Sequence, residues 1–332
     1  MPVWLDLQSG TGSAFYLIGG YLRIKGTIDA ARLARAIGEV IEGCDALRLG
    51  FHPRDPQQFF ASSLAVPLRT MAVASEEAFL SFIAQDFTRP VDLDHGPLFD
   101  FMLARTKADL SFLLFRFHHL LVDGHAIRLV IRAIAAAYDN PGHKAEAFPS
   151  YRRFIAEDAA YRSSPRHTGD LDYWRERLRN LPDPLFPVRT PAPRFPAPSI
   201  RWWVDWPDYQ RFLDTTHAHD VTPFQALSGL LAALMARHTG SRDLVLGVPI
   251  LNRPGAVFKQ TIGMFTGLMP LRLAFDPRER IPQWLERVGE QLRQDYRHQR
   301  VSIHEILHAL RLGQRRLFDV ALSYEKSDYD FP

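Results

Sequence analysis

The sequence predicts an α/β protein with mixed sheets, built as two lobes of similar pattern. The chain has 332 residues, a length that fits two lobes of roughly 150 residues each. Strand-like and helix-like segments alternate along it, and this alternation starts again after residues 181–198, where seven of eighteen residues are proline. Such a stretch resists both helix and sheet and is typical of an extended linker. We therefore divide the chain into residues 1–180, a linker at 181–198, and residues 199–332.

The first lobe is predicted from short apolar runs and from helical spacing of apolar residues. Asp29 is expected to cap the first helix, and a hairpin is expected where a charged turn joins two apolar strands. In order, we expect a strand at 15–24, a helix from 29, a strand at 46–51, a helix at 76–87, strands at 98–104 and 110–117, and helices at 124–138, 151–161 and 170–181.

The second lobe repeats this alternation after the linker. Its first strand is rich in aromatic residues, which favour sheets. In order, we expect a strand at 200–206, a helix at 222–238, strands at 244–249 and 268–275, helices at 281–298 and 302–310, and a last strand at 317–324.

Composition narrows the functional class. Hydrophobic residues make up 46% of the chain and charged residues 23%, both near the averages of globular proteins. No apolar run reaches the length of a membrane span. The 40 basic and 37 acidic residues are interspersed, so nucleic-acid binding has little support, while an acidic protein partner fits the net charge of +3. The start of the chain lacks the basic and apolar pattern of a secretory signal, so we expect a cytoplasmic protein. Cys44 follows the helical spacing of neighbouring apolar residues and is expected to lie in the core.

One short segment carries the predicted chemistry: residues 118–124 read HHLLVDG. Four specified residues at these offsets arise by chance with odds on the order of one in a thousand in such a chain. They lie between an apolar strand and the start of a helix, where side chains are presented at the rim of a sheet. His118 and His119 can exchange protons near neutral pH, and His119 is our candidate to accept a proton from, or orient, an attacking amine or hydroxyl.

Of the other two specified residues, Asp123 has a structural role in this interpretation, whereas Gly124 is counted with His118 and His119 among the catalytic residues. A carboxylate at Asp123 that leaves solvent needs a cationic partner. Gly124 lets the backbone approach an acyl group, and the amides at the start of the next helix can polarise its carbonyl oxygen. His304 and His308 are interpreted as a solvated helix face, and no histidine has trustworthy metal-ligand spacing. No phosphate-binding glycine pattern is present.

The segment resembles the motif His-His-x-x-x-Asp-Gly of the condensation domains of nonribosomal peptide synthetases. Further segments are similar to the other motifs of that family, in the same order, so the likeness covers nearly the whole chain. They are residues 4–6 with 16–21, 44–51, 157–161 with 173–174, 247–253 with 262–272, 297–300, and 317–324 with 328–330.

The resemblance implies a V-shaped pair of chloramphenicol-acetyltransferase-like lobes with His119 midway along a tunnel. It implies Arg253 as the ionic partner of Asp123, and substrates that arrive on phosphopantetheine arms of carrier domains or of coenzyme A. No bound cofactor or metal is expected, and the protein is expected to be monomeric. Residues 19–21 and 297–300 are similar to the starter subtype, which joins an acyl donor to the first carrier-bound amino acid. Compared with the family, the second lobe is expected to be incomplete.

Two rival functions stay open at this point. One is a free-standing acyltransferase of the same superfamily, which forms esters from a coenzyme A donor and a hydroxyl acceptor. The other is a catalytically silent docking module, against which the intact His118, His119, Asp123 and Gly124 count.

Overall fold

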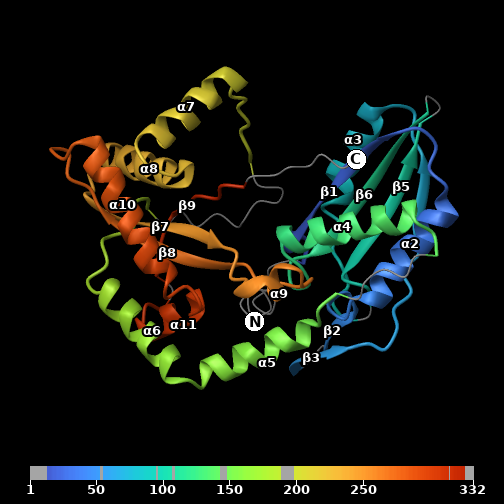
Figure 1. Cartoon of the computed structure of the whole chain (residues 1–332), viewed down its shortest axis with the longest axis horizontal. Coiled ribbons are helices and arrows are strands. Elements are labelled where there is room, and N and C mark those ends of the chain that lie inside the picture. Colours follow the sequence, from blue (N-terminus) through green and yellow to red (C-terminus); the bar gives the residue numbers. More distant parts are fainter. Residues whose placement is uncertain are drawn as a thin grey trace.

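The protein consists of two α/β bodies that diverge from a common base (Figure 1). The computed structural model describes residues 13–52, 55–94, 96–106, 109–142, 148–187, 198–313 and 315–325. Each body has its own sheet and its own apolar core. The V-shaped, mixed α/β arrangement expected from the sequence is therefore confirmed.

The first lobe is built on a four-stranded mixed sheet. Its strand order is β1-β6-β5-β4, with β1 and β5 antiparallel to the central β6 and β4 parallel to β5. The predicted hairpin is formed by β5 and β6. The strands are β1 (Leu17–Lys25), β4 (Arg69–Ala72), β5 (Phe99–Arg105) and β6 (Leu110–His118).

Both faces of this sheet are covered because side chains alternate along β6. Phe115 and Phe117 enter the main core, which includes α2 (Ala30–Gly43) and α4 (Gly124–Asp139). Phe112 and Leu114 enter a smaller core that also holds Phe79 of α3 (Glu76–Asp86). The Asp29 side chain accepts from the backbone nitrogens of Ala31 and Arg32, so the predicted cap of α2 is confirmed.

The second lobe has a three-stranded sheet among the described residues. Its order is β8-β7-β9, in which β8 is antiparallel and β9 parallel to the central strand. Helices α8 and α10 contact each other, and α10 also contacts β8. The elements are α7 (Trp206–Ala218), α8 (Pro223–Thr239), β7 (Asp243–Ile250), β8 (Gly267–Ala274), α10 (Ile281–Tyr296), α11 (Ile303–Ala309) and β9 (Val320–Ala321).

Among the described residues, two segments join the lobes. At the base, α5 (Tyr151–Arg162) places Tyr151 in the first core, while α6 (Pro165–Arg177) places Trp174 in the second. Near the centre, α9 (Gly255–Lys259) belongs by sequence to the second lobe, yet Phe258 lies in the first core (Figure 1). The division of the chain at 181–198 stays a prediction, and residues 188–197 of that linker lie outside the described residues.

Several predicted elements are wrong or shorter than expected. Residues 200–205 form no strand, because no described strand pairs with them; the Trp202 and Trp203 side chains are 82% and 91% exposed. The strand expected at 317–324 is reduced to β9. The one expected at 46–51 begins as a 3₁₀ turn, η2 (Ala46–Arg48), before β2 (Leu49–His52). Unpredicted elements are η1 (Ser13–Tyr16), β3 (Asp55–Phe60), β4, α7 and α9.

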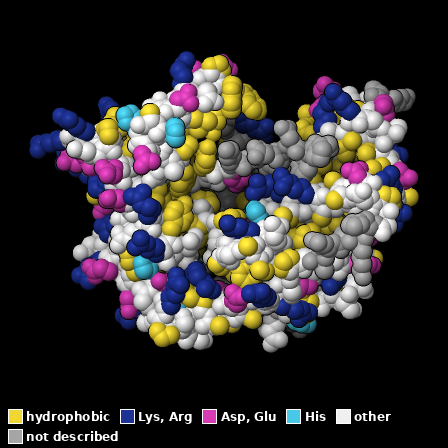
Figure 2. All heavy atoms as spheres, viewed as in Figure 1, with side chains coloured by type: hydrophobic (Ala, Val, Ile, Leu, Met, Phe, Trp, Pro, Cys, Tyr) yellow, Lys and Arg dark blue, Asp and Glu magenta, His cyan; other side chains and the backbone are white. Residues whose placement is uncertain are grey.

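The surface between the lobes is hollowed, and apolar side chains gather along the α7 side of the hollow (Figure 2). Trp206 of α7 is 67% exposed, and Leu234 of α8 is 60% exposed. Within the described part of the chain, every helix is too short or too polar to cross a lipid bilayer.

Candidate functional site

The two histidines lie where β6 ends at the rim of the first sheet. The backbone nitrogen of His118 donates to the Leu98 oxygen at 2.7 Å, and that of His119 donates to the Tyr16 oxygen at 2.7 Å. These bonds fix the last residues of the strand from both sides. The tandem histidines are thus held by backbone pairing, independently of their own side chains.

His118 is a fully buried, neutral imidazole. Its Nδ1 accepts from the Leu120 nitrogen at 3.1 Å, so the ring proton is on Nε2. Burial, helped by the neighbouring His119, lowers the pKa of His118 from 6.5 to about 4. Nε2 finds no hydrogen-bond partner in the described structure. The His118 side chain therefore braces the turn and carries no charge at neutral pH.

His119 has the opposite arrangement and is only partly buried. Its Nδ1 lies 3.0 Å from the Val122 carbonyl oxygen. A carbonyl only accepts, so Nδ1 carries the proton and Nε2 is left with a lone pair. This is the tautomer that a general base needs, with the imidazole held in place by the turn itself.

Asp123 is completely buried at the start of α4 and is saturated with hydrogen bonds. Its Oδ1 caps the helix by accepting from the Ala126 nitrogen at 2.8 Å. Its Oδ2 accepts from the backbone nitrogens of Phe265 and Thr266 at 3.0 and 3.3 Å, both in the second lobe. The carboxylate therefore joins the histidine turn of residues 118–124 to the other lobe.

Arg253 completes this contact from the second lobe. Its Nη2 donates to both Asp123 oxygens, at 2.7 and 2.9 Å, and neither side chain is exposed. The guanidinium also donates to the carbonyl oxygens of Phe258, Thr261 and Gly263. Burial lowers the pKa of Arg253, and the Asp123 charge opposes that shift. The structure thus brings together the two residues, 130 positions apart, that the motifs paired.

Gly124 is exposed beside the turn, and the fold does not require glycine there. Its φ lies outside the left-handed region, and an added Cβ would meet no atom within 4 Å. Ala126 and Ile127 donate their backbone amides to Asp123, so among the first amides of α4 only those of Gly124 and His125 can serve a ligand at this helix start. The arrangement can accept an acyl carbonyl close to the backbone.

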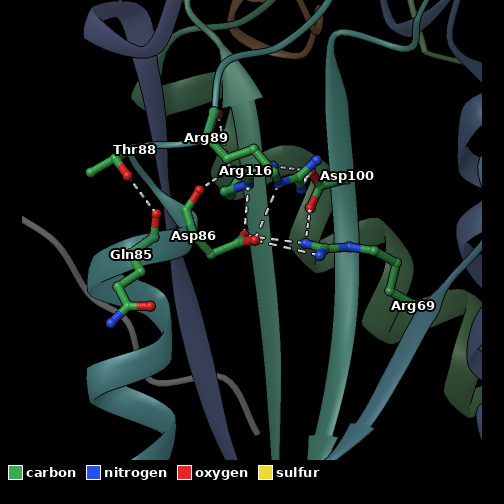
Figure 3. A network of polar contacts seen from close by, with 7 residues as sticks. All are labelled: Arg69, Gln85, Asp86, Thr88, Arg89, Asp100 and Arg116. Carbon is green, nitrogen blue, oxygen red and sulfur yellow. Dashed lines mark hydrogen bonds and ion pairs between the residues drawn. The ribbon is translucent and has the colours of Figure 1, made fainter.

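A buried ionic cluster two residues before His118 was missed by the sequence analysis (Figure 3). Arg116 of β6 is fully buried and bonds the carboxylates of Asp86 and Asp100. Arg69 and Arg89 bond the same two carboxylates from the solvent side. Burial would raise the pKa of Asp100, but Arg116 and then Arg69 bring it below its ordinary value. The cluster ties β4, β5, β6 and the end of α3 together next to the site.

Replacing Arg116 by methionine is expected to lower the free energy of unfolding by about 2 kcal/mol. That is less than the usual loss for a broken buried pair, because Arg69 and Arg89 still neutralise the two carboxylates. Urea denaturation followed by circular dichroism measures the change. Arg23→Met is the control, since its pair with Glu76 on the same face is exposed and contributes less than about 1 kcal/mol. Equal losses in both variants would contradict a structural role of the cluster.

Metal-ligating groups are not assembled in the part of the chain that the structure describes: no three histidine, cysteine or acidic side chains come together there. Phe265, whose ring lies 3.9 Å from the Arg253 guanidinium carbon, and Tyr151, whose hydroxyl donates to the Met264 oxygen at 2.6 Å, support the site and were not predicted. Phe265 lies in the motif-like segment 262–272, whereas Tyr151 has no sequence signal beyond being aromatic.

Two α/β lobes that meet at a turn with tandem histidines are typical of the two-lobed acyltransferase folds, and this protein has that arrangement. The family comparison is more specific: the sequence model of the Condensation domain matches residues 3–330. The chain belongs to the condensation-domain family. It is thus of the kind found in nonribosomal peptide synthetases, as the motifs predicted.

Relatives and solved structures agree with this assignment. The chain is 26% identical, over 98% of its length, to a dimodular nonribosomal peptide synthase of Bacillus subtilis, and 29% identical, over 99%, to an isonitrile lipopeptide synthase of Streptomyces coeruleorubidus. It spans 14% and 23% of those two proteins.

Two solved structures are similar to nearly the whole chain. One is the first condensation domain of the calcium-dependent antibiotic synthetase, with a TM-score of 0.82 and 25% identity over 98% of this chain and 79% of that one. The other is a variant of the starter condensation domain of rhizomide synthetase in complex with C8-CoA. Its TM-score is 0.84 and its identity 25%, over 96% of this chain and 76% of that one.

Proposed function

We propose that the chain catalyses amide formation between an acyl thioester donor and a carrier-bound aminoacyl acceptor, as a starter condensation domain. The observation that carries this proposal is the His119 tautomer: its Nδ1 proton is engaged by the Val122 oxygen, which leaves Nε2 as an acceptor in a partly exposed position. In this state the imidazole can accept a proton from an amine nucleophile that enters through the hollow between the lobes.

In the proposed reaction the acceptor amine attacks the thioester carbonyl carbon. The new C–N bond forms, the C–S bond breaks, and the sulfur leaves as a thiol. His119 Nε2 orients the amine and takes its proton, which then passes to the departing sulfur, so no net proton is consumed. The backbone amides of Gly124 and His125, at the start of α4, stabilise the developing oxyanion. Asp123 and Arg253 hold the turn and take no proton. No nucleophilic side chain is needed.

The donor is proposed to be a fatty or aryl acyl group on coenzyme A or on an acyl carrier protein. Support comes from two similar proteins, the rhizomide synthetase starter domain in complex with C8-CoA and the isonitrile lipopeptide synthase. The partners are then acyl and peptidyl carrier domains, with substrates held on phosphopantetheine. A lone buried thiol, Cys44, fits the reducing cytoplasm that we propose as the location of a monomeric protein.

The proposal is tested by intact-mass analysis of an aminoacyl carrier protein mixed with the full chain and a panel of acyl thioesters. An amide-linked product on the carrier is the expected result. A product ester on a hydroxyl acceptor, without any amide, would favour the free-standing acyltransferase. Carrier binding without any product from any thioester would favour the docking module.

Replacing Gly124 by alanine is expected to leave folding intact but to slow the reaction. The free space around its Cα accommodates a methyl group, and alanine is the better helix former. The methyl occupies the position proposed for the acyl carbonyl, and a misplacement of about 1 Å can cost 10²-fold in rate. The melting temperature and kcat/KM are measured together. An unchanged kcat/KM in a stably folded variant would remove Gly124 from the site.

A further inference from the structure

The start of α5 is joined to the second-lobe loop that holds Asp123. Tyr151, the first residue of α5, is buried, and its hydroxyl donates to the Met264 carbonyl oxygen at 2.6 Å. The next two backbone nitrogens of the loop, those of Phe265 and Thr266, donate to the Asp123 carboxylate. Tyr151 therefore binds this loop one residue before the loop binds the histidine turn.

The Tyr151 ring also packs directly on the loop of residues 263–266. Gly263 has a φ of +153°, and a Cβ added there would overlap the Tyr151 ring. The ring makes an edge contact with Phe265, with 5.3 Å between the two ring centroids. Because the ring leaves no room for a side chain at Gly263, helix and loop approach more closely here than two ordinary side chains would allow.

Asp45 holds the start of α5 from the first lobe. Its carboxylate accepts from the Tyr151 backbone nitrogen at 3.0 Å and from the Ser150 hydroxyl. Ser150 is the N-cap of α5, so both donors belong to the first turn of this helix. Asp45 lies in segment 44–51, which resembles a family motif and has no part in the chemistry proposed above. The contact fixes the backbone from which the Tyr151 side chain extends.

The loop and the histidine turn complete the connection to His119. The loop binds the Asp123 carboxylate, and the neighbouring Val122 supplies the carbonyl oxygen that accepts the Nδ1 proton of His119. A shift of the loop moves Asp123 and, through the shared backbone, the Val122 oxygen. Either nitrogen of a neutral imidazole can carry the proton. His119 therefore favours Nδ1 only while this acceptor stays within reach.

We propose that Asp45 and Tyr151 are positioning residues, which fix the loop at Met264 and thereby keep His119 in the tautomer that leaves Nε2 free. The consequence for acyl transfer rests on the proposed function. The tautomer itself can be measured in the full chain without any substrate.

The test is nitrogen-15 NMR of the full chain, labelled at histidine, at about pH 7.5, above the ordinary pKa of histidine. The His119→Gln variant identifies the His119 signals. Tyr151→Phe keeps the ring and removes only the hydroxyl, so the Met264 oxygen loses this donor. We expect the ratio of Nδ1-protonated to Nε2-protonated His119 to fall about fivefold, the factor that corresponds to one net hydrogen bond.

The transfer assay gives a second measurement on the same variant. We expect Tyr151→Phe to lower kcat about tenfold, because a misplacement of about 1 Å in a positioned group can cost up to 10²-fold. KM should stay nearly unchanged, since the lost hydroxyl lies in a buried contact and not on a substrate.

Tyr161→Phe is the matched control. Tyr161 lies near the other end of α5 and is also buried, and its hydroxyl donates to the Asp170 carboxylate of α6 at 2.7 Å. Both variants thus remove one buried hydroxyl and its hydrogen bond from the same helix. We expect Tyr161→Phe to lose stability but to keep the His119 signals and the kcat of the wild type.

Two variants of Asp45 test the other end of the connection and serve if Tyr151→Phe does not fold. Asp45→Ala removes both acceptors at the start of α5 and should change the His119 signals in the same direction as Tyr151→Phe. Asp45→Asn offers an oxygen to the Tyr151 nitrogen and an amide donor to the Ser150 oxygen, so it should restore most of the wild-type ratio.

Wild-type His119 signals in both Tyr151→Phe and Asp45→Ala would overturn the proposal, as would an equal change in Tyr161→Phe. The two measurements separate this proposal from the proposed function. If no thioester yields product but the His119 signals change as expected, the proposed function fails and the positioning role stands. If product forms and Tyr151→Phe matches the wild type in kcat and in its His119 signals, the function stands and the positioning role fails.

Discussion

The His119→Ala variant is expected to lower kcat for amide formation by 10²–10⁴-fold, the range that positioned general bases contribute. The reason is the lone pair on Nε2, which the Val122 contact leaves available and which alanine removes. Binding of the aminoacyl carrier should change little, because the loss concerns proton transfer and amine orientation. Single-turnover kinetics with saturating carrier measure the chemical step directly.

The His119→Ala variant is expected to fold normally, so a loss of rate can be assigned to the missing imidazole. The His119 side chain bonds the Val122 oxygen and is partly exposed, so loss of this hydrogen bond should cost no more than about 1 kcal/mol. His119→Gln is the matched variant, since it restores a polar side chain without a titratable base and is expected to remain slow. A rate within threefold of the wild type in both would show that orientation by other groups is sufficient.

The local part of the site could be predicted from the sequence, because its signals are short-range. The turn of residues 118–124 follows an apolar strand and precedes a helix, and both elements form where the pattern placed them. Asp29 caps α2 for the same kind of local reason, a side-chain oxygen within reach of the next free amides. Asp123 and Arg253 are 130 residues apart in the sequence, and only the family motif indicated that they pair.

Long-range features account for what was not predicted. The aromatic run at 200–206 has strong sheet propensity, but propensity is realised only when a strand finds a partner, and no described strand pairs with it. Helix α9 has only five residues, too few for a periodic pattern to be recognised. Its position in the first core depends on contacts of Phe258 with that lobe.

The Arg116 cluster has a local signal in the sequence. Apart from Ser111 and His118, the other residues of strand 110–118 are apolar, and a charge inside such a buried strand requires partners. Its partners come from α3 and β5, so their identity depends on the tertiary fold. The sequence thus supports the prediction that an ionic cluster exists there, without naming its members.

The Arg253→Met variant is expected to lose about 3–5 kcal/mol of unfolding free energy, the cost of leaving a buried charge without its partner. Asp123 would retain only three backbone donors, from Ala126, Phe265 and Thr266. The carbonyl oxygens that Arg253 serves would also lose a donor. Denaturation in urea measures the loss, and Arg211→Met, which breaks an exposed pair with Asp208, should cost less than about 1 kcal/mol.

A double-mutant cycle separates the ion pair from the other contacts of Arg253. Asp123→Asn keeps the shape of the side chain and removes its charge, which leaves the Arg253 guanidinium buried and uncompensated. We compare the loss of unfolding free energy in the double variant Asp123→Asn, Arg253→Met with the sum of the losses in the two single variants. If the ion pair dominates, the loss in the double variant should be smaller than that sum by about 2 kcal/mol or more. Strict additivity would instead assign the cost of Arg253→Met to the carbonyl oxygens of Phe258, Thr261 and Gly263. In that case Arg253 would act mainly by folding its own segment, and the lobes would be joined chiefly by the backbone donors of Phe265 and Thr266.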